Sequence, residues 1–139
     1  MFKTSHAVDI LATPEAAWAM VKDVARWRQW FLGVELVQLH GGFAPGAQGL
    51  LYLDDGKVYR LSIEKFLPGL MDMHVGLAYK AKMHLQISVA PTPEGCRIRL
   101  EGELLGVGAI LHTFGWGKNL RTGLVPTTRR LGILSQGEH

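Results

Sequence analysis

The sequence predicts an α+β domain in which a curved antiparallel sheet of six or seven strands wraps around a long C-terminal helix. Two observations predict this class. Apolar and polar residues alternate through a series of short segments before Gly106, as in strands with one buried face. Beyond Gly106, apolar residues recur at helical spacing instead. Because antiparallel sheets twist and curl, the concave apolar face needs a cover, and only the last segment is long enough to provide one.

The first element is expected to be a half-buried strand over Phe2–Leu11, with His6 in the apolar phase of the alternation, where a core histidine is favoured over one that transfers protons. The residues Thr13–Glu15 then supply an N-cap, a proline for the first helical position and an acid for the first turn. A short helix should therefore begin directly after the first strand.

A second short helix is expected next. Asp23 is the expected cap of this helix, which carries Trp27 and Trp30 three residues apart. The two tryptophans are interpreted as packing residues that hold the short helices to the domain.

From Gly33 onward the pattern predicts strands again. Glycine-rich and proline-rich turns separate them, and Asp54–Gly56 is a typical hairpin turn. The last of these strands has the clearest alternation, with apolar residues on one face and charged residues on the other. The expected strands are Val34–Leu39, Gly49–Leu53, Lys57–Phe66, Met71–Leu77, Met83–Val89 and Cys96–Leu104.

The segment after Gly106 is interpreted as one long helix. Three glycines and Pro126 interrupt it, so we expect a kink near Pro126. The apolar residues with helical spacing are Ile110, Leu111, Phe114, Leu120, Leu124 and Leu131.

Composition limits the possible functions. The chain has 139 residues, of which 47% are hydrophobic and 19% charged, so we expect one folded domain over residues 1–139. Its net charge of +3 is scattered and does not indicate nucleic-acid binding. The longest apolar run, Leu104–Leu111, is far shorter than the ~20 residues that cross a bilayer, so no stable membrane insertion is expected. The single cysteine, Cys96, cannot form an internal disulfide, and we expect a cytoplasmic protein.

Three short stretches carry a resemblance to a known family. Ala12–Trp18 resembles a strand-to-helix stretch "P-E-x-V-W", Asp23–Trp30 resembles "D-x-x-x-W-x-x-W", and Gly95–Arg97 resembles a Gly-Thr-Arg turn. These features are similar to those of the START-like superfamily, also called SRPBCC or Bet v 1-like, in its bacterial polyketide cyclase/dehydrase branch. The resemblance implies a helix-grip fold with a cavity between sheet and helix for lipids, polyketides or similar apolar molecules. It carries over no catalytic motif.

The predicted function is the binding of a small hydrophobic molecule in this cavity. Hydroxyl groups of Tyr52 and Tyr59 would orient a polar group on the ligand, and methionines would adapt to its shape. Trp27 lies where the mouth of the cavity could be. The candidate ligand-binding residues are His6, Trp27, Tyr52, Tyr59, Leu61, Met73, Val75, Leu85 and Phe114.

Two other functions are left open by the sequence. One is an enzyme of the polyketide cyclase or dehydratase kind, in which a cavity histidine such as His6, or a tyrosine, transfers a proton. The other is a domain that binds a protein partner, including a second copy in a homodimer. No cofactor or metal site is predicted, because the six histidines form neither a helical pair nor a Cys/His cluster. Cys96 lies in the apolar phase of its strand and is interpreted as a core residue.

Overall fold

The computed structural model describes residues 3–77, 80–106 and 118–137, and it has the predicted α+β architecture. Two short helices and a turn of 3-10 helix follow the first strand, and a long helix ends the chain. The elements are β1 (Lys3–Ile10), α1 (Pro14–Lys22), η1 (Val24–Arg26), α2 (Trp27–Trp30), β2 (Val34–His40), β3 (Gln48–Leu53), β4 (Val58–Leu67), β5 (Leu70–Gly76), β6 (Ala81–Pro91), β7 (Cys96–Gly106) and α3 (Lys118–Ser135).

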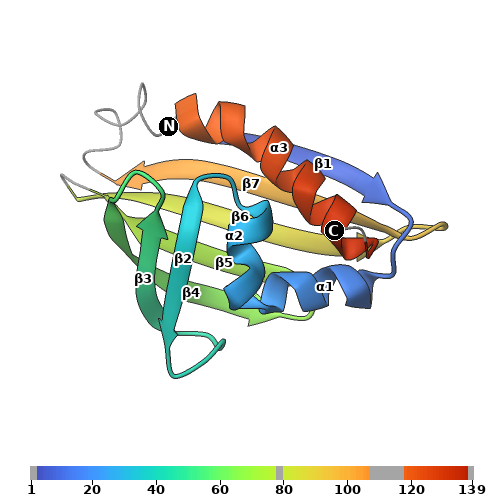
Figure 1. Cartoon of the computed structure of the whole chain (residues 1–139), viewed down its shortest axis with the longest axis horizontal. Coiled ribbons are helices and arrows are strands. Elements are labelled where there is room, and N and C mark those ends of the chain that lie inside the picture. Colours follow the sequence, from blue (N-terminus) through green and yellow to red (C-terminus); the bar gives the residue numbers. More distant parts are fainter. Residues whose placement is uncertain (1–2, 78–79, 107–117, 138–139) are drawn as a thin grey trace.

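The seven strands form one antiparallel sheet in the order β1-β7-β6-β5-β4-β3-β2. The sheet is curved, as Figure 1 shows. The register shifts between Ile63 and Lys65 in β4, and between Val34 and Leu36 in β2. Irregularities of this kind bend a strand and increase its twist. The sheet therefore has a concave and a convex face.

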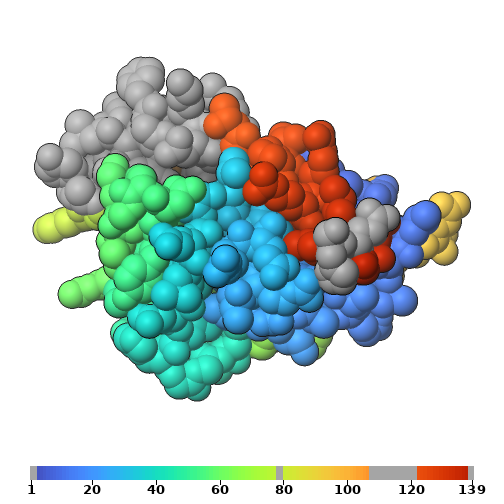
Figure 2. Space-filling model, viewed as in Figure 1, coloured from blue at the N-terminus to red at the C-terminus, as the bar shows by residue number. Residues whose placement is uncertain are grey.

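The helices lie on the concave face. The long helix α3 runs across β1 and β7, and α1 and α2 lie beside it over the middle of the sheet (Figure 1). In the space-filling view, the blue and cyan atoms of α1 and α2 lie directly against the red atoms of α3 (Figure 2). The helix α3 continues through Pro126. The helix-grip arrangement predicted from the family resemblance is therefore confirmed.

Side-chain alternation along the strands produces the core. In β6, for example, Met83, Leu85 and Ile87 are at most 2% exposed, whereas the residues between them are half-buried. Successive side chains of a strand point to opposite faces, so the buried set faces the helices. The other fully buried residues of the strands are Leu51, Ile63, Met71, Met73, Val75, Cys96, Ile98, Leu100 and Leu104.

One local expectation holds and another is wrong at the start of the helices. Thr13 caps α1, because its Oγ1 accepts a hydrogen bond from the backbone N–H of Ala16 at 3.1 Å, and Pro14 is the first helical residue. Asp23 precedes η1 but makes no side-chain capping bond there. The backbone N–H of Arg26 bonds to the carbonyl of Asp23 at 3.0 Å instead. A tight backbone turn therefore connects α1 to α2 without a side-chain cap.

Candidate ligand-binding site

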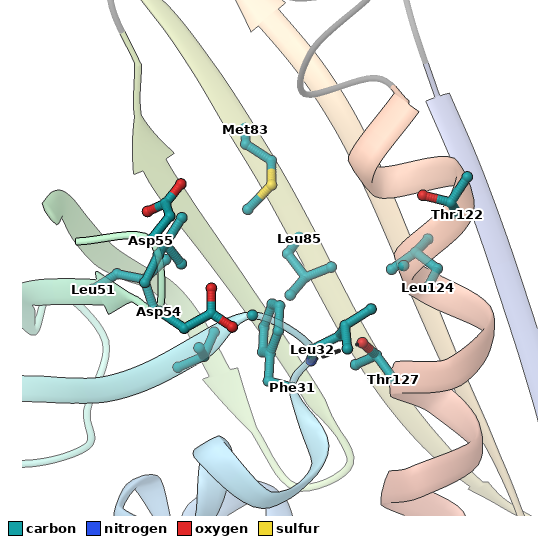
Figure 3. Close-up of a pocket in the computed structure, with 14 residues that line it drawn as sticks. Phe31, Leu32, Leu51, Asp54, Asp55, Met83, Leu85, Thr122, Leu124 and Thr127 are labelled. Atoms are coloured by element: carbon teal, nitrogen blue, oxygen red, sulfur yellow. Dashed lines mark hydrogen bonds between the residues drawn. The ribbon is translucent and has the colours of Figure 1, made fainter. Parts of the chain in front are cut away.

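A cavity of about 270 Å³, which we call the concave pocket, opens between the sheet and the first turns of α3. Figure 3 shows the strands β3 and β6 on one side of it, α3 on the other, and the segment after α2 between them. The residues that line it are Phe31, Leu32, Gly33, Val34, Leu51, Leu53, Asp54, Asp55, Met83, Leu85, Thr122, Gly123, Leu124 and Thr127.

The sheet supplies the apolar floor of the pocket. Leu51 from β3 and Met83 and Leu85 from β6 are 1%, 2% and 0% exposed. Their side chains point toward the helices because each occupies the inward phase of its strand. Met83 adds a flexible thioether, which adapts to differently shaped apolar molecules. This floor favours an apolar group of a ligand.

The segment between α2 and β2 forms a second wall, and it is held in place by α3. The backbone N–H of Leu32 donates a hydrogen bond to Oγ1 of Thr127 at 3.1 Å (Figure 3). Gly33 follows with a φ of 85°, a left-handed conformation that glycine adopts without strain. The turn brings Phe31 and Leu32 to the pocket, and the bond to Thr127 couples this wall to the helix.

The helix α3 forms the third wall of the pocket, and one of its lining residues, Gly123, has no side chain. Leu124 and Thr127 are 4% and 2% exposed. Gly123 lies between them and Thr122, and a Cβ built on it would have Leu32 Cδ2, at 3.8 Å, as its nearest neighbour. The missing side chain of Gly123 therefore leaves space that a small residue could occupy without a clash.

Two carboxylates stand at the rim. Asp54 and Asp55 belong to the turn between β3 and β4, and the backbone N–H of Asp54 donates to the carbonyl of Gly33 at 2.9 Å. Oδ1 of Asp55 accepts a bond from the backbone N–H of Lys57 at 2.9 Å. In Figure 3 the side chain of Asp54 points toward Phe31. A carboxylate accepts hydrogen bonds only, so this rim suits a ligand group that donates them.

Aromatic rings fill the concave face beyond the pocket. Trp27 and Trp30 are fully buried, with ring centroids 5.6 Å apart, and Phe43 lies 6.0 Å from Trp27 and 4.7 Å from Phe66. Trp18 stacks on Phe66 at 5.6 Å. We call these residues the aromatic cluster: Trp18, Trp27, Trp30, Phe43 and Phe66.

Only some of the residues predicted from the sequence as ligand contacts lie at the concave pocket. Leu85 lines it. Leu61, Met73 and Val75 are buried on the same face of the sheet, but they do not line the pocket. Tyr59 is half-buried on that face, opposite Leu51 in the register. Their roles as ligand contacts stay predictions.

The other predicted contacts lie elsewhere. His6 is half-buried on the concave face of β1, opposite Leu100. Trp27 belongs to the aromatic cluster, and its Nε1–H donates to the carbonyl of Val21 at 2.8 Å. Tyr52 follows the inward Leu51 and therefore points to the convex face, where its hydroxyl lies 3.1 Å from Oε1 of Gln38. Phe114 lies outside the described residues.

The sequence interpretation missed several lining residues. Met83 and Leu124 were placed in the apolar phases of their elements but not at a ligand site. Asp54 and Asp55 were assigned to a hairpin turn, which is correct, but nothing in the sequence places that turn beside α3. The alternation in β6 could have identified Met83, since it occupies the same face as Leu85.

Other kinds of chemistry find no support in the described ranges. No three His, Cys, Asp or Glu side chains come together there as metal ligands would. The thiol of Cys96 is buried, with Sγ 3.8 Å from the carbonyl oxygen of Thr13, and burial raises its pKa above the ordinary value. It is therefore a thiol at neutral pH rather than a thiolate nucleophile. None of the helices described combines the length and apolarity that a membrane span requires.

Comparison with known proteins agrees with this architecture. Residues 1–128 match a family model described as polyketide cyclase / dehydrase and lipid transport. A search of curated proteins by sequence gives no match.

Solved structures show the same fold at low sequence identity. A protein from Mesorhizobium loti is 16% identical with a TM-score of 0.78, covering 99% of this chain and 98% of its own. Norcoclaurine synthase from Thalictrum, a point mutant solved with a transition-state analogue, is 14% identical with a TM-score of 0.73, covering 97% and 94%. The di-domain ARO/CYC protein StfQ of the steffimycin biosynthetic pathway is 12% identical with a TM-score of 0.75, and the match covers 98% of this chain and 51% of StfQ.

Proposed function

The chain belongs to the polyketide cyclase / dehydrase and lipid transport family, and from this premise we propose that it binds a small hydrophobic ligand in the concave pocket. The single observation that carries the proposal is a cavity of about 270 Å³ whose floor is made of Leu51, Met83 and Leu85. Ligand pockets are typically concave, mostly apolar and equipped with a few polar groups that fix orientation.

The size of the apolar floor sets the strength of binding. A ligand that buries about 300 Å² of apolar surface gains about 7 kcal/mol from transfer out of water, before the cost of association. Because the cost of association must still be subtracted, a micromolar dissociation constant is the tightest binding expected when no strong polar anchor is present.

The rim determines which polar group the ligand carries. Asp54 and Asp55 place carboxylates at the mouth, and the hydroxyl oxygen of Thr127 already accepts one hydrogen bond, from the backbone N–H of Leu32. A ligand carboxylate would meet like charges there, whereas an amine or hydroxyl would donate to the carboxylates. We infer that the preferred ligand is an apolar molecule with a hydrogen-bond donor at one end.

The first experiment tests the pocket itself. Calorimetric titration with 1-octanol should show micromolar to millimolar binding, and Gly123→Leu should abolish it because the new side chain fills the space beside Leu32. Val125→Leu is the matched control, since Val125 is 36% exposed on the same helix and does not line the pocket. Circular dichroism confirms folding of each variant. Unchanged binding by folded Gly123→Leu would contradict the proposed site.

The second experiment tests the rim. Octylamine should bind more tightly than 1-octanol, and octanoate more weakly, so that the dissociation constants of the three probes differ by on the order of tenfold. Asp54→Asn should reduce this difference in dissociation constants. Glu94 is an exposed carboxylate in the turn between β6 and β7, and Glu94→Gln should leave the difference unchanged. Equal affinities for all three probes would remove the role assigned to the carboxylates.

The remaining predictions from the sequence stay open proposals. Proton transfer by a cavity histidine or tyrosine has no support from the described lining residues, since neither residue type is among them. A single domain over residues 1–139, a homodimer, the absence of nucleic-acid binding and a cytoplasmic location likewise stay predictions.

A further inference from the structure

The convex face of the sheet has a hollow of its own. Its volume is about 370 Å³, and its lining residues come from β2, with His40 at the end of that strand, and from β3, β4, β5 and β6, on the side away from the helices. We call it the convex hollow. The side chains used below are Arg60, Ser62, Glu64, His74 and Lys82, all of which line it together with Gly76.

The strand register explains why a hollow forms there. Leu61 pairs with Val75, which places Arg60 beside Gly76, and Gly76 pairs with Lys82. Leu61 and Val75 point inward and are buried, so their neighbours Arg60 and Gly76 face outward. Because Gly76 has no side chain, the row across these three strands has a gap between two basic residues.

Positive charge dominates the walls of this gap. Arg60 and Lys82 are exposed, and neither makes an ion pair with any residue that the structure describes. Two basic side chains without acidic partners, on either side of a space, attract an anion to it. Arginine also binds planar and tetrahedral oxyanions through paired N–H donors.

Among the residues that line the hollow, Glu64 carries the single carboxylate, and it has partners of its own. Oε1 of Glu64 accepts a hydrogen bond from the hydroxyl of Ser62 at 2.9 Å and lies 3.2 Å from Nδ1 of His74. Burial lowers the pKa of His74, while Glu64 acts in the opposite direction. With His74 neutral, the formal charges of Arg60, Lys82 and Glu64 leave the hollow positive.

We propose that the convex hollow binds a small oxyanion, a phosphate or carboxylate group, over Gly76 and between Arg60 and Lys82. This site is separate from the concave pocket, from which the sheet divides it. The two sites also have opposite charge, because carboxylates form the rim of the concave pocket. Binding at one is therefore distinguishable from binding at the other.

The test is a pair of NMR titrations at constant ionic strength, one with inorganic phosphate and one with acetate. Saturable shifts of the Gly76 and Ser62 amide signals are expected, with dissociation constants in the millimolar range or below. Shifts with phosphate alone assign the site to a doubly charged group, and shifts with both anions assign it to oxyanions in general. No saturable shift at Gly76 with either anion overturns the proposal.

Two variants locate the anion. Gly76→Val fills the hollow without a clash, since a Cβ there would have only the carbonyl oxygen of Arg60 as a neighbour, at 4.0 Å. Valine also suits a strand. We expect this variant to fold normally and to bind phosphate at least about tenfold more weakly. If folded Gly76→Val binds as tightly as the unmodified protein, the proposed position is wrong.

Two variants that lose the same charge distinguish binding at the hollow from attraction of the anion to the protein's overall positive charge. Lys82→Gln and Lys22→Gln each remove one positive charge, but Lys22 is an exposed residue at the end of α1. Lys82→Gln should weaken phosphate binding by about tenfold and Lys22→Gln by less than about twofold. If both variants lose the same phosphate affinity, the binding depends only on the net charge of the protein, and the proposed site is wrong.

Discussion

The concave face of this protein has two regions that differ in how completely they are filled. At one region, the rings of the aromatic cluster lie 4.7–6.0 Å apart by centroid, and none of these residues lines the concave pocket. At the other, mainly leucine, methionine, threonine and glycine residues surround a cavity of about 270 Å³, and Phe31 joins the two regions because its ring lies 5.5 Å from that of Trp30. Both regions lie between the same sheet and the same group of helices.

The difference lies in how closely neighbouring side chains approach one another, because large rings pack in contact in one region, whereas the side chains of the other leave space. The helix α3 shows a similar difference between two positions that both lack a side chain. A Cβ on Gly123, at the pocket, would have its nearest neighbour at 3.8 Å, whereas a Cβ on Gly132 would meet Ile10 Cγ2 at 3.0 Å and Val8 Cγ1 at 3.4 Å. Interiors are normally packed to the density of organic crystals, so the open region is the exception that suits a ligand.

The largest loss of stability is expected when a side chain of the aromatic cluster is truncated. Trp27→Ala should lower the free energy of unfolding by about 3–5 kcal/mol, because a fully buried indole is removed from the aromatic cluster. Leu124→Ala, at the pocket wall, should cost only about 2 kcal/mol, because Leu124 already borders a cavity. Urea denaturation of both variants measures the comparison. Equal losses would mean that the two regions are equally well packed.

A smaller effect separates the two tryptophans of the aromatic cluster. Trp27 donates its Nε1–H to the carbonyl of Val21, whereas the buried Nε1–H of Trp30 has no hydrogen-bond partner among the described residues. Changing either to phenylalanine removes similar ring volume, but only Trp27→Phe leaves a carbonyl without its donor. We expect Trp27→Phe to be more destabilising than Trp30→Phe by about 1–2 kcal/mol.

Urea denaturation measures this difference in the free energy of unfolding, and the fluorescence of the remaining tryptophans follows the same unfolding transition independently. A buried indole whose N–H lacks a partner carries a desolvation penalty, which Trp30→Phe removes. If Trp30→Phe were the more destabilising change, Trp30 would need a partner that the present contacts do not include.

The fold was predictable because it rests on local patterns. The alternation in β6 and β7 gave the inward residues correctly, and Thr13, Pro14 and Glu15 marked the start of α1. Such signals depend on neighbouring residues, and they repeat along each element. The failed cap at Asp23 shows the limit, because the backbone N–H of Arg26 bonds to the carbonyl of Asp23 and not to its side chain.

The site was only partly predictable, because contacts distant in sequence determine it. Leu85 was identified from its phase, but the position of the pocket along the sheet depends on where Leu32 and Thr127 meet, 95 residues apart. The hairpin Asp54–Gly56 was recognised as a turn, yet its position at the rim depends on the bond from Asp54 to Gly33. Tyr52 shows that a one-residue change of phase places a hydroxyl on the opposite face.

The smallest predicted effect tests the comparison within α3. Gly123→Ala should raise the free energy of unfolding by about 0.5–1 kcal/mol, because alanine favours the helix and its methyl group meets only Leu32 at ordinary contact distance. Gly132→Ala should gain nothing or lose about 1 kcal/mol, because its methyl group would press on Ile10 and Val8 and offset the same gain in helix propensity. Thermal and urea unfolding measure the free energy of unfolding of both variants. The gain in helix propensity from glycine to alanine is the same at both positions and cancels in the difference between them. Stabilisation of the same size at both positions would mean that β1 yields easily to α3, and the contrast between a filled and an open region would then not hold along this helix.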